Sequence, residues 1–367
     1  MKKEFILLLF VFPLVLVYLF PDNLKVKKKP KYDIHLTFQD SFQKLQGIDT
    51  EDWNYVQTKK DYCALAMYEK VYEKNKHFQF TSNPTFKIPQ KIHLIWIGPR
   101  PFPQKSIENV RSWIAYHPDW TFILWTDRLR PPPCNGMEVK LLQDFHFEFL
   151  KEKYQESQNW GEKADIWRYE ILYQKGGLYI DHDVRCFRPF HNLHSGYDFY
   201  VGLEMPHESI DGLAVTAGNA LIGAKPYHPV IEGTIQKVLE RWEAVSKEFS
   251  SKDAVTQATR VVHRTLIALT HAFEERLNLL ENTDIVFPAC YFFPKHGLPG
   301  FYSEHLYATT WHDLWETPSQ KSFLNSLKNL SKRDAKILRV ELVSLIVLFG
   351  CFVLYFLINK QIKKGFK

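Results

Sequence analysis

Apolar and polar positions between residues 88 and 280 form blocks that predict strands alternating with helices. Short apolar runs bounded by glycine, proline or aspartate predict strands over 91–97, 120–125, 178–181, 198–203 and 220–222. Apolar residues at helical spacing predict helices near 103–116 and over 137–153, 160–175, 227–249 and 254–280. This alternation indicates an α/β fold, a single Rossmann-type domain with a mostly parallel central sheet and helices on both faces.

Two uncharged apolar runs flank this region. The first, over 5–20, lies between two lysines and a lysine-rich patch over 25–31. A signal peptide is one interpretation, but no small-residue cleavage site follows the run, so we favour an uncleaved anchor. The second run, over 342–358, is close to the shortest helix that spans a bilayer, and a basic tail follows it directly. We therefore predict a transmembrane helix there rather than a buried core helix.

Charge and composition change this picture mainly at the ends of the chain. The 367-residue chain has a formal net charge of +6, but its basic excess lies over 1–31 and 328–367, and the region between them is net negative. Basic segments beside apolar runs suit a membrane surface, whereas a net-negative globular part argues against nucleic acid as a partner. The five cysteines include no C-x-x-C pair, so we expect mostly buried free thiols and no structural zinc.

The most specific chemical signal is a pair of aspartates at the end of the predicted strand 178–181. A double glycine starts this strand, and Asp181 and Asp183 follow at its C-terminal edge, where open α/β sheets bind ligands. Two carboxylates there suit a hard divalent cation, Mg²⁺ or Mn²⁺, that also holds a diphosphate. His182 would face the other side of an extended strand, and we interpret it as a structural imidazole. The chain has neither a G-x-G-x-x-G after its first strand nor a Walker loop, which argues against a dehydrogenase or a kinase.

These motifs resemble those of a known family. The pattern A-D-x-x-R-Y over 164–169, with G-G-x-Y-x-D-x-D over 176–183, is similar to the sugar-transfer region of the DXD-containing glycosyltransferases of family 32. Further segments fit in the family's order: a first strand over 88–98, a second over 117–127 and a closing Trp-His segment over 309–313. The family includes catalytic subunits of inositol phosphoceramide mannosyltransferases and yeast-type α-mannosyltransferases, and the glucosylating bacterial toxins resemble it more remotely. The resemblance covers about residues 86–315 and implies a glycosyltransferase-A-like fold.

The resemblance also implies a set of catalytic residues, namely Asp165, Arg168, Asp181 and Asp183. It places Asp181 and Asp183 on the metal, with His312 as a third ligand or a diphosphate donor. Asp313, next to His312, is an alternative. Asp165 and Arg168 lie three apart on a predicted helix and share a face. The resemblance places Asp165 at sugar hydroxyls and Arg168 at the diphosphate or the sugar, beyond a merely local ion pair.

The resemblance implies that three more residues bind the donor together with Asp165 and Arg168. Trp96 either stacks on the base or packs in the core, and Asp127 either reaches the nucleoside or caps its loop. Asn219 lies in a segment that resembles the family's segment after the acceptor loop, and the resemblance implies that it holds hydroxyls of the donor or the acceptor. The loop 204–217 offers several candidates for an acceptor-side acid or base, among which the sequence does not choose: Glu204, His207, Glu208 and Asp211.

Together these patterns divide the chain into six parts. They are a membrane anchor over 1–24, a stalk and accessory helical segment over 25–85, the glycosyltransferase catalytic domain over 86–325, a juxtamembrane linker over 326–339, a transmembrane helix over 340–359 and a basic tail over 360–367. Within the accessory segment, the spacing predicts a helix over 61–74, with Leu65, Tyr68 and Tyr72 on one face.

The leading hypothesis is a membrane-anchored, metal-dependent glycosyltransferase. The resemblance implies that it moves a hexose from a nucleoside-diphosphate sugar to a lipid-linked or glycan acceptor, with retention at the anomeric carbon. A catalytically silent binding protein of the same fold and a carboxylate-based glycoside hydrolase are the alternatives. A regulatory membrane subunit could be a further partner. We expect a Golgi or endoplasmic reticulum membrane with a lumenal catalytic domain in a eukaryote, or the inner membrane in a bacterium, because the flanking charges do not fix the orientation.

Overall fold

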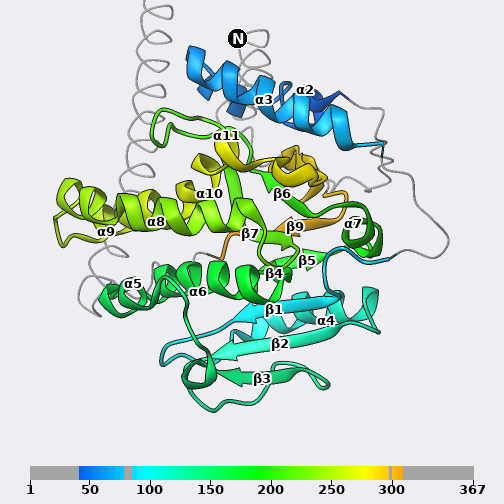
Figure 1. Ribbon diagram of the computed structural model, residues 1–367, viewed down its shortest axis with the longest axis vertical. Coiled ribbons are helices and arrows are strands. Elements are labelled where there is room, and N and C mark those ends of the chain that lie inside the picture. Colours follow the sequence, from blue (N-terminus) through cyan, green and yellow to red (C-terminus); the bar gives the residue numbers. More distant parts are fainter. Residues whose placement is uncertain (1–40, 78–84, 297–299, 309–367) are drawn as a thin grey trace, which may run out of the picture.

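The computed structural model describes residues 41–77, 85–296 and 300–308 (Figure 1). Within these residues a seven-stranded sheet runs through the centre, in the order β3-β2-β1-β4-β7-β6-β8. Its strands are β1 (Lys91–Ile95), β2 (Thr121–Thr126), β3 (Glu138–Leu141), β4 (Gly177–Ile180), β6 (Phe199–Leu203), β7 (Ala217–Ala224) and β8 (Asp284–Phe287). β7 is antiparallel to β4 and β6, and the other neighbouring pairs are parallel. The predicted α/β fold with a mostly parallel sheet is confirmed.

Helices pack against this sheet and against one another. They are α4 (Ile107–Tyr116), α5 (Lys151–Glu156), α6 (Trp160–Lys175), α7 (His191–Gly196), α8 (Pro229–Glu248), α9 (Ala254–Val261), α10 (Ile267–His271) and α11 (Phe273–Arg276). α6 contacts β4 and β7, and α8 packs on both α6 and α10. The side chain of Asn159 caps the first turn of α6, and Gly176, with φ +59°, ends it. α6 therefore spans the predicted helix 160–175.

Two predicted helices differ from the structure. The segment 137–153 contains the short edge strand β3, a 3₁₀ turn over Leu142–Asp144 and a helix only from Lys151. β3 exists because it pairs in parallel with β2, which is a non-local contact. The segment 254–280 is not one helix, because a π-helical turn over Val262–Leu266 separates α9 from α10 and α11 follows separately.

The double glycine at the start of β4, Gly176 and Gly177, allows this strand to lie close beside β1. Gly177 has φ +105°, and a Cβ atom there would lie 2.7 Å from the carbonyl oxygen of Lys91 and 2.9 Å from Nε2 of His93. A larger residue would therefore be strained by its backbone conformation and would also clash with β1. The two strands consequently end at one edge of the sheet, where the candidate site lies.

The described part of the accessory segment packs onto the domain. It comprises α2 (Phe42–Leu45), a 3₁₀ turn over Glu51–Tyr55 and α3 (Lys59–Asn75), which lie beyond β6 in Figure 1. The helix predicted over 61–74 corresponds to α3, which begins with a capping box between Thr58 and Asp61. Its predicted apolar face is buried in the main hydrophobic core through Leu65, Tyr68 and Tyr72.

Both predicted membrane helices, the linker and the basic tail lie outside the described residues. Among the residues that are described, no helix combines the length and the apolar character needed to cross a membrane. The four cysteines in the described part of the chain are free, as predicted: Cys63, Cys134, Cys186 and Cys290. Two of them, Cys186 and Cys290, are buried.

Candidate active site

A cavity of about 270 Å³ opens at the edge of the sheet where β1 and β4 end. Its walls come from β1 and the loop after it, α6, the turn after β4, the facing ends of β6 and β7, the π-helical turn and the segment around His305. Several of the residues predicted from the sequence line this cavity, namely Trp96, Asp165, Arg168, Asp181, Asp183 and Asn219. Asp127 is not among the lining residues, and His312 lies outside the described part of the chain.

The two aspartates of the motif do not share a strand, contrary to the sequence-based expectation. β4 ends at Ile180, Asp181 and His182 lie in a turn, and Asp183 directly precedes β5 (Val184–Cys186). Side chains in a turn do not alternate between two faces as they do in an extended strand. As a result His182 also lines the cavity, where its Nδ1 hydrogen-bonds to the hydroxyl of Ser106 at 2.8 Å.

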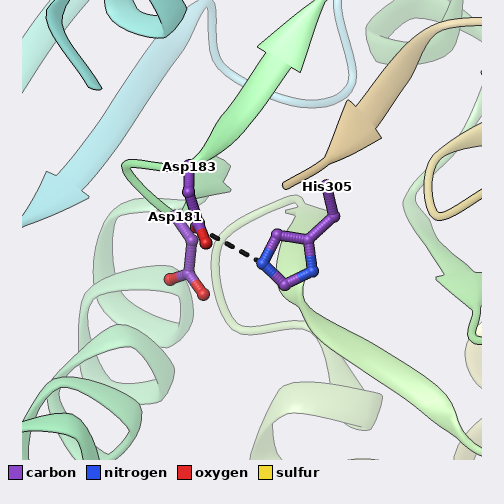
Figure 2. A group of neighbouring side chains, drawn as sticks. All are labelled: Asp181, Asp183 and His305. Carbon is purple, nitrogen blue, oxygen red and sulfur yellow. Dashed lines mark ion pairs between the residues drawn. The ribbon is translucent and has the colours of Figure 1, made fainter. Parts of the chain in front are cut away.

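His305 joins the two aspartates. The three side chains offer ligand atoms that all lie within 4.8 Å of one another, and Nε2 of His305 lies 3.3 Å from Oδ1 of Asp183 (Figure 2). β9 (Ser303–His305) brings the histidine there because it pairs antiparallel with β5, opposite Val184. Two carboxylates and an imidazole suit Mn²⁺ and accommodate Mg²⁺, so this donor set fits the metal that the motif implies.

His305 was not predicted from the sequence, because the resemblance implied His312 instead, as a third ligand or a diphosphate donor. No local motif marks His305, since only the long-range pairing of β5 with β9 carries it to the motif. Its other ring nitrogen, Nδ1, is buried and has no hydrogen-bond partner among the described residues. The role of His312 stays a prediction.

The charges around Asp183 keep it ionised. Burial disfavours its charged form, but hydrogen bonds from His305 and from the backbone N–H of Ala308, at 2.7 Å, outweigh burial and hold the pKa of Asp183 below its usual range. Burial also works against a charged His305, yet Asp183 raises the pKa of His305 above its ordinary value. The negative charge that attracts a proton to this imidazole would equally attract a cation.

Arg168 ties α6 to the metal-binding motif. Its guanidinium lies 2.7 Å from Oδ1 of Asp165 and 3.2 Å from Oδ1 of Asp181, and it also donates to the backbone carbonyl of Asn219. The hydroxyl of Tyr179 donates to the same Asp181 oxygen at 2.6 Å. The guanidinium of Arg168 thus contacts three groups, and its contact with Asp181 fixes the orientation of that carboxylate.

Asp165 is held from the other side by the π-helical turn. The hydroxyl of Thr265 donates to its Oδ2 at 2.6 Å, and Tyr169 donates to the carbonyl of Thr265 at 2.9 Å. Burial raises the pKa of Asp165 to about 6, although Arg168 and Thr265 favour its charged form. Turns of this kind often occur at functional sites, and this one fixes a carboxylate at the cavity wall.

Trp96 and Asp127 have different surroundings. The indole N–H of Trp96 donates to the carbonyl of Arg100 at 2.9 Å, and its ring packs edge-on against His182 with centroids 5.0 Å apart. Asp127 instead pairs with Arg128 at 2.7 Å and with Arg130 at 3.3 Å. Arg130 also donates to two carbonyls of the loop after β1, so Asp127 is linked to the cavity wall through Arg130 and that loop.

The comparisons with known proteins agree with this site. Residues 103–200 match the family described as the glycosyltransferase sugar-binding region containing the DXD motif. This match confirms the resemblance over residues 103–200, which are similar to the DXD-containing sugar-binding region of glycosyltransferases.

Several named proteins share this region. Inositol phosphoceramide mannosyltransferase 3 of Schizosaccharomyces pombe is 36% identical over 107 residues, which cover 29% of this chain and 27% of that protein. Inositol phosphoceramide mannosyltransferase 1 of the same yeast is 26% identical over 248 residues, 65% of this chain and 68% of its own length. Subversion of eukaryotic traffic protein A of Legionella pneumophila is 33% identical over 118 residues, 28% of this chain and 18% of that protein. This chain thus matches less than a third of the length of mannosyltransferase 3 and of the Legionella protein.

Proposed function

We propose that this protein is a metal-dependent glycosyltransferase that moves a hexose from a nucleoside-diphosphate sugar to a lipid-linked or glycan acceptor. The observation that carries the proposal is the convergence of Asp181, Asp183 and His305 beside a cavity that Arg168 also lines. The family match over 103–200 supports the reaction class. The names of the two yeast relatives make GDP-mannose the first donor to test and inositol phosphoceramide the first acceptor.

A divalent cation at this site would neutralise the diphosphate that leaves with the nucleoside. Asp181, Asp183 and His305 would hold it, and Arg168 keeps Asp181 in the orientation that this requires. In the transfer itself, the acceptor oxygen bonds to the anomeric carbon as the bond from that carbon to the phosphate oxygen breaks. The electron pair stays on the diphosphate, which also takes the proton of the acceptor hydroxyl. This same-face reaction retains the anomeric configuration and needs no covalent intermediate on the protein.

The donor would lie along the sheet edge from β1 toward β7. Trp96 already donates its indole N–H to a backbone carbonyl, so its ring face is the part that a nucleobase would stack on. Asp165 and Asn219 also line the cavity and would bind sugar hydroxyls. Asp127 would contribute by holding the loop after β1 through Arg130.

Membrane attachment is part of the proposal. The apolar runs over 5–20 and 342–358, each with basic neighbours, support an anchor at both ends of the catalytic domain. An enzyme held in this way would meet a lipid-linked acceptor at the bilayer surface. The Golgi or endoplasmic reticulum membrane in a eukaryote, or the inner membrane in a bacterium, would be its place, and a regulatory membrane subunit could accompany it.

The hydrolase alternative fits the site less well. Glycosidases place two carboxylates about 5–9.5 Å apart, on either side of the scissile bond. Asp181 and Asp183 instead lie two residues apart in one turn, their ligand atoms and that of His305 all lie within 4.8 Å of one another, and both accept hydrogen bonds from neighbouring side chains. Such a cluster is suited to a cation rather than to opposed acid and base roles.

Release of nucleoside diphosphate by the full chain in detergent micelles tests the proposal. GDP-mannose, UDP-glucose and UDP-galactose are each incubated with Mn²⁺ or with EDTA. We expect release from at least one donor with Mn²⁺, none with EDTA, and loss of release in Asp183→Asn. The exposed Asp144→Asn variant is the matched control and should behave like the wild type. Metal-independent release, or none from any donor, would contradict the proposal.

A further inference from the structure

Glu204 differs from the other acidic residues that line the cavity. Asp165 and Asp181 form ion pairs with Arg168, and Asp183 forms one with His305. Within the described part of the chain, the carboxylate of Glu204 makes no hydrogen bond or ion pair, although it is partly buried in the same cavity wall. Both of its oxygens are therefore available to accept hydrogen bonds from a ligand.

The strand order places Glu204 at the end of the cavity opposite Trp96. Across the sheet, β1 is followed by β4, β7 and β6. Trp96 follows β1, Asp181 follows β4, Asn219 lies near the start of β7 and Glu204 follows β6 directly. If the base lies at Trp96 and the diphosphate at Asp181, the sugar lies near Asn219 and the acceptor approaches beyond it, beside Glu204.

Tyr307 provides a second unpartnered polar group at this end. It lines the cavity, and its buried hydroxyl has no hydrogen-bond partner among the described residues. Tyr307 carries a phenolic hydroxyl, which can both donate and accept a hydrogen bond. Its backbone is in the left-handed region, with φ +48°, a conformation that non-glycine residues adopt mostly at constrained functional positions.

The accessory segment holds Glu204 in place. The side-chain amide of Gln46, which is fully buried, donates to the carbonyl oxygen of Glu204 at 2.6 Å and accepts from the backbone N–H of Ala289 at 2.9 Å. The next residue, Gly47, approaches Met205 so closely that a Cβ atom on it would lie 2.2 Å from the methionine methyl carbon. A segment that precedes the family-matched region 103–200 thus fixes one end of the cavity.

We propose that Glu204 and Tyr307 form the acceptor subsite and that it binds a ring polyol, such as a sugar or an inositol headgroup. Glu204 accepts hydrogen bonds from hydroxyls that neighbour the attacking one, and the hydroxyl of Tyr307 bonds to another. Gln46 is a positioning residue that acts through Glu204. This assignment rests on the proposed function and adds the class of acceptor to it. Glu204 and Tyr307 do not belong to the metal group of Asp181, Asp183 and His305, although the ring of Tyr307 packs beside that of His305 with centroids 4.1 Å apart.

The test measures transfer from GDP-mannose with Mn²⁺, by the full chain in detergent, to myo-inositol and to methyl α-mannoside. Donor hydrolysis in the absence of acceptor is measured alongside. Because a hydrogen bond to a charged group contributes about 1.5–3 kcal/mol, we expect Glu204→Gln to raise the acceptor KM about ten-fold or more. The donor KM, the hydrolysis rate and the Mn²⁺ affinity should stay within about two-fold of the wild type. Glu152→Gln, an exposed acid on α5, is the matched control and should change neither KM.

Gln46 is tested by a double-mutant cycle. Gln46→Leu should raise the acceptor KM and spare the donor KM, and combining it with Glu204→Gln should add little further, because the two residues act as a unit. The exposed Gln43→Leu in α2 is its control. An additive double variant would overturn the positioning role, and Glu204→Gln alone tests the subsite if Gln46→Leu does not fold.

The outcomes separate this inference from the proposed function. Donor hydrolysis by the wild type without transfer to either polyol, or an unchanged acceptor KM in Glu204→Gln, overturns the subsite and leaves the glycosyltransferase standing. A loss of Mn²⁺ affinity or a raised donor KM in Glu204→Gln also overturns it, because the residue would then serve the metal or the donor. No metal-dependent release from any of the three donors overturns both.

Discussion

Oδ1 of Asp181 lies 3.2 Å from a guanidinium nitrogen of Arg168, whose other contacts are Asp165 and the carbonyl of Asn219. One planar cation thus joins α6, the turn after β4 and the start of β7. The orientation of a proposed metal ligand therefore depends on a residue that is not itself a ligand. The guanidinium also lies over the ring of Tyr179, 4.2 Å from its centroid, which restricts it further.

Replacing Arg168 by Lys should weaken metal binding. A lysine keeps the charge, but its single ammonium cannot reproduce three fixed contacts, so Asp181 would lose its orientation. We expect the Mn²⁺ affinity of Arg168→Lys to fall about 10-fold or more, as is typical when a residue that supports a ligand is lost. Titration with Mn²⁺ measures it. Arg111→Lys, in an exposed pair with Glu108, is the control, and equal affinities in the two variants would refute the orienting role.

Gly177→Ala should destabilise the fold more than Gly136→Ala. Both glycines have positive φ, +105° and +84°, so both substitutions carry backbone strain. Only at Gly177 would the added Cβ also meet β1, 2.7 Å from the carbonyl oxygen of Lys91, whereas Gly136 faces open space. We expect an additional loss of about 1–3 kcal/mol in the free energy of unfolding for Gly177→Ala. Urea denaturation of both variants measures the difference, and equal losses would show that β4 can move away from β1.

Buried neutral histidines should make the fold sensitive to mild acid. His93 accepts from Trp125 through Nδ1 and bonds to the carbonyl of Gly176 through Nε2 at 2.8 Å, and burial lowers its pKa to about 4. Burial likewise lowers the pKa of His117 to about 4, and its Nε2 accepts from the backbone of Phe190.

These shifts fix the sign of the effect. The unfolded chain binds protons at these histidines below about pH 6.5, whereas the folded chain does so only near pH 4. The free energy of unfolding is therefore unaffected by these histidines above about pH 6.5 and decreases progressively as the pH falls toward 4, because protons bind preferentially to the unfolded chain. Denaturation at pH 7.5, 6 and 5 should show the fall, with a smaller slope in His93→Gln and an unchanged slope in the exposed His77→Gln. A stability that is constant from pH 7.5 to 5 would contradict these burial effects.

Sequence reasoning placed the aspartate motif correctly because the signals around it are local. α6 carries its own N-cap at Asn159, and the glycines before β4 fix the turn between them. Helical spacing and glycine punctuation are properties of neighbouring residues, so they can be recognised without the fold. Asp165 and Asp183 both line the cavity, and their catalytic roles stay predictions.

The parts that could not be predicted depend on long-range contacts. β3 is a strand because of its pairing with β2, and its own residues suggested a helix. His305 reaches Asp183 only because β9 pairs with β5, and Gln46 reaches Glu204 only because α2 packs onto the domain. Asp127 follows β2 as expected, but its carboxylate forms ion pairs with Arg128 and Arg130. No sequence motif indicates that these arginines would take the place of a nucleoside as its partner.

The most direct test of the account is a titration of the full chain with Mn²⁺ in the presence of GDP, in which electron paramagnetic resonance measures the binding. The account predicts a single site in the wild type and in the Asp144→Asn control, with affinity at least about 10-fold weaker in Asp183→Asn and in His305→Gln. A titration of Asp183→Asn that coincides with that of the wild type would contradict it.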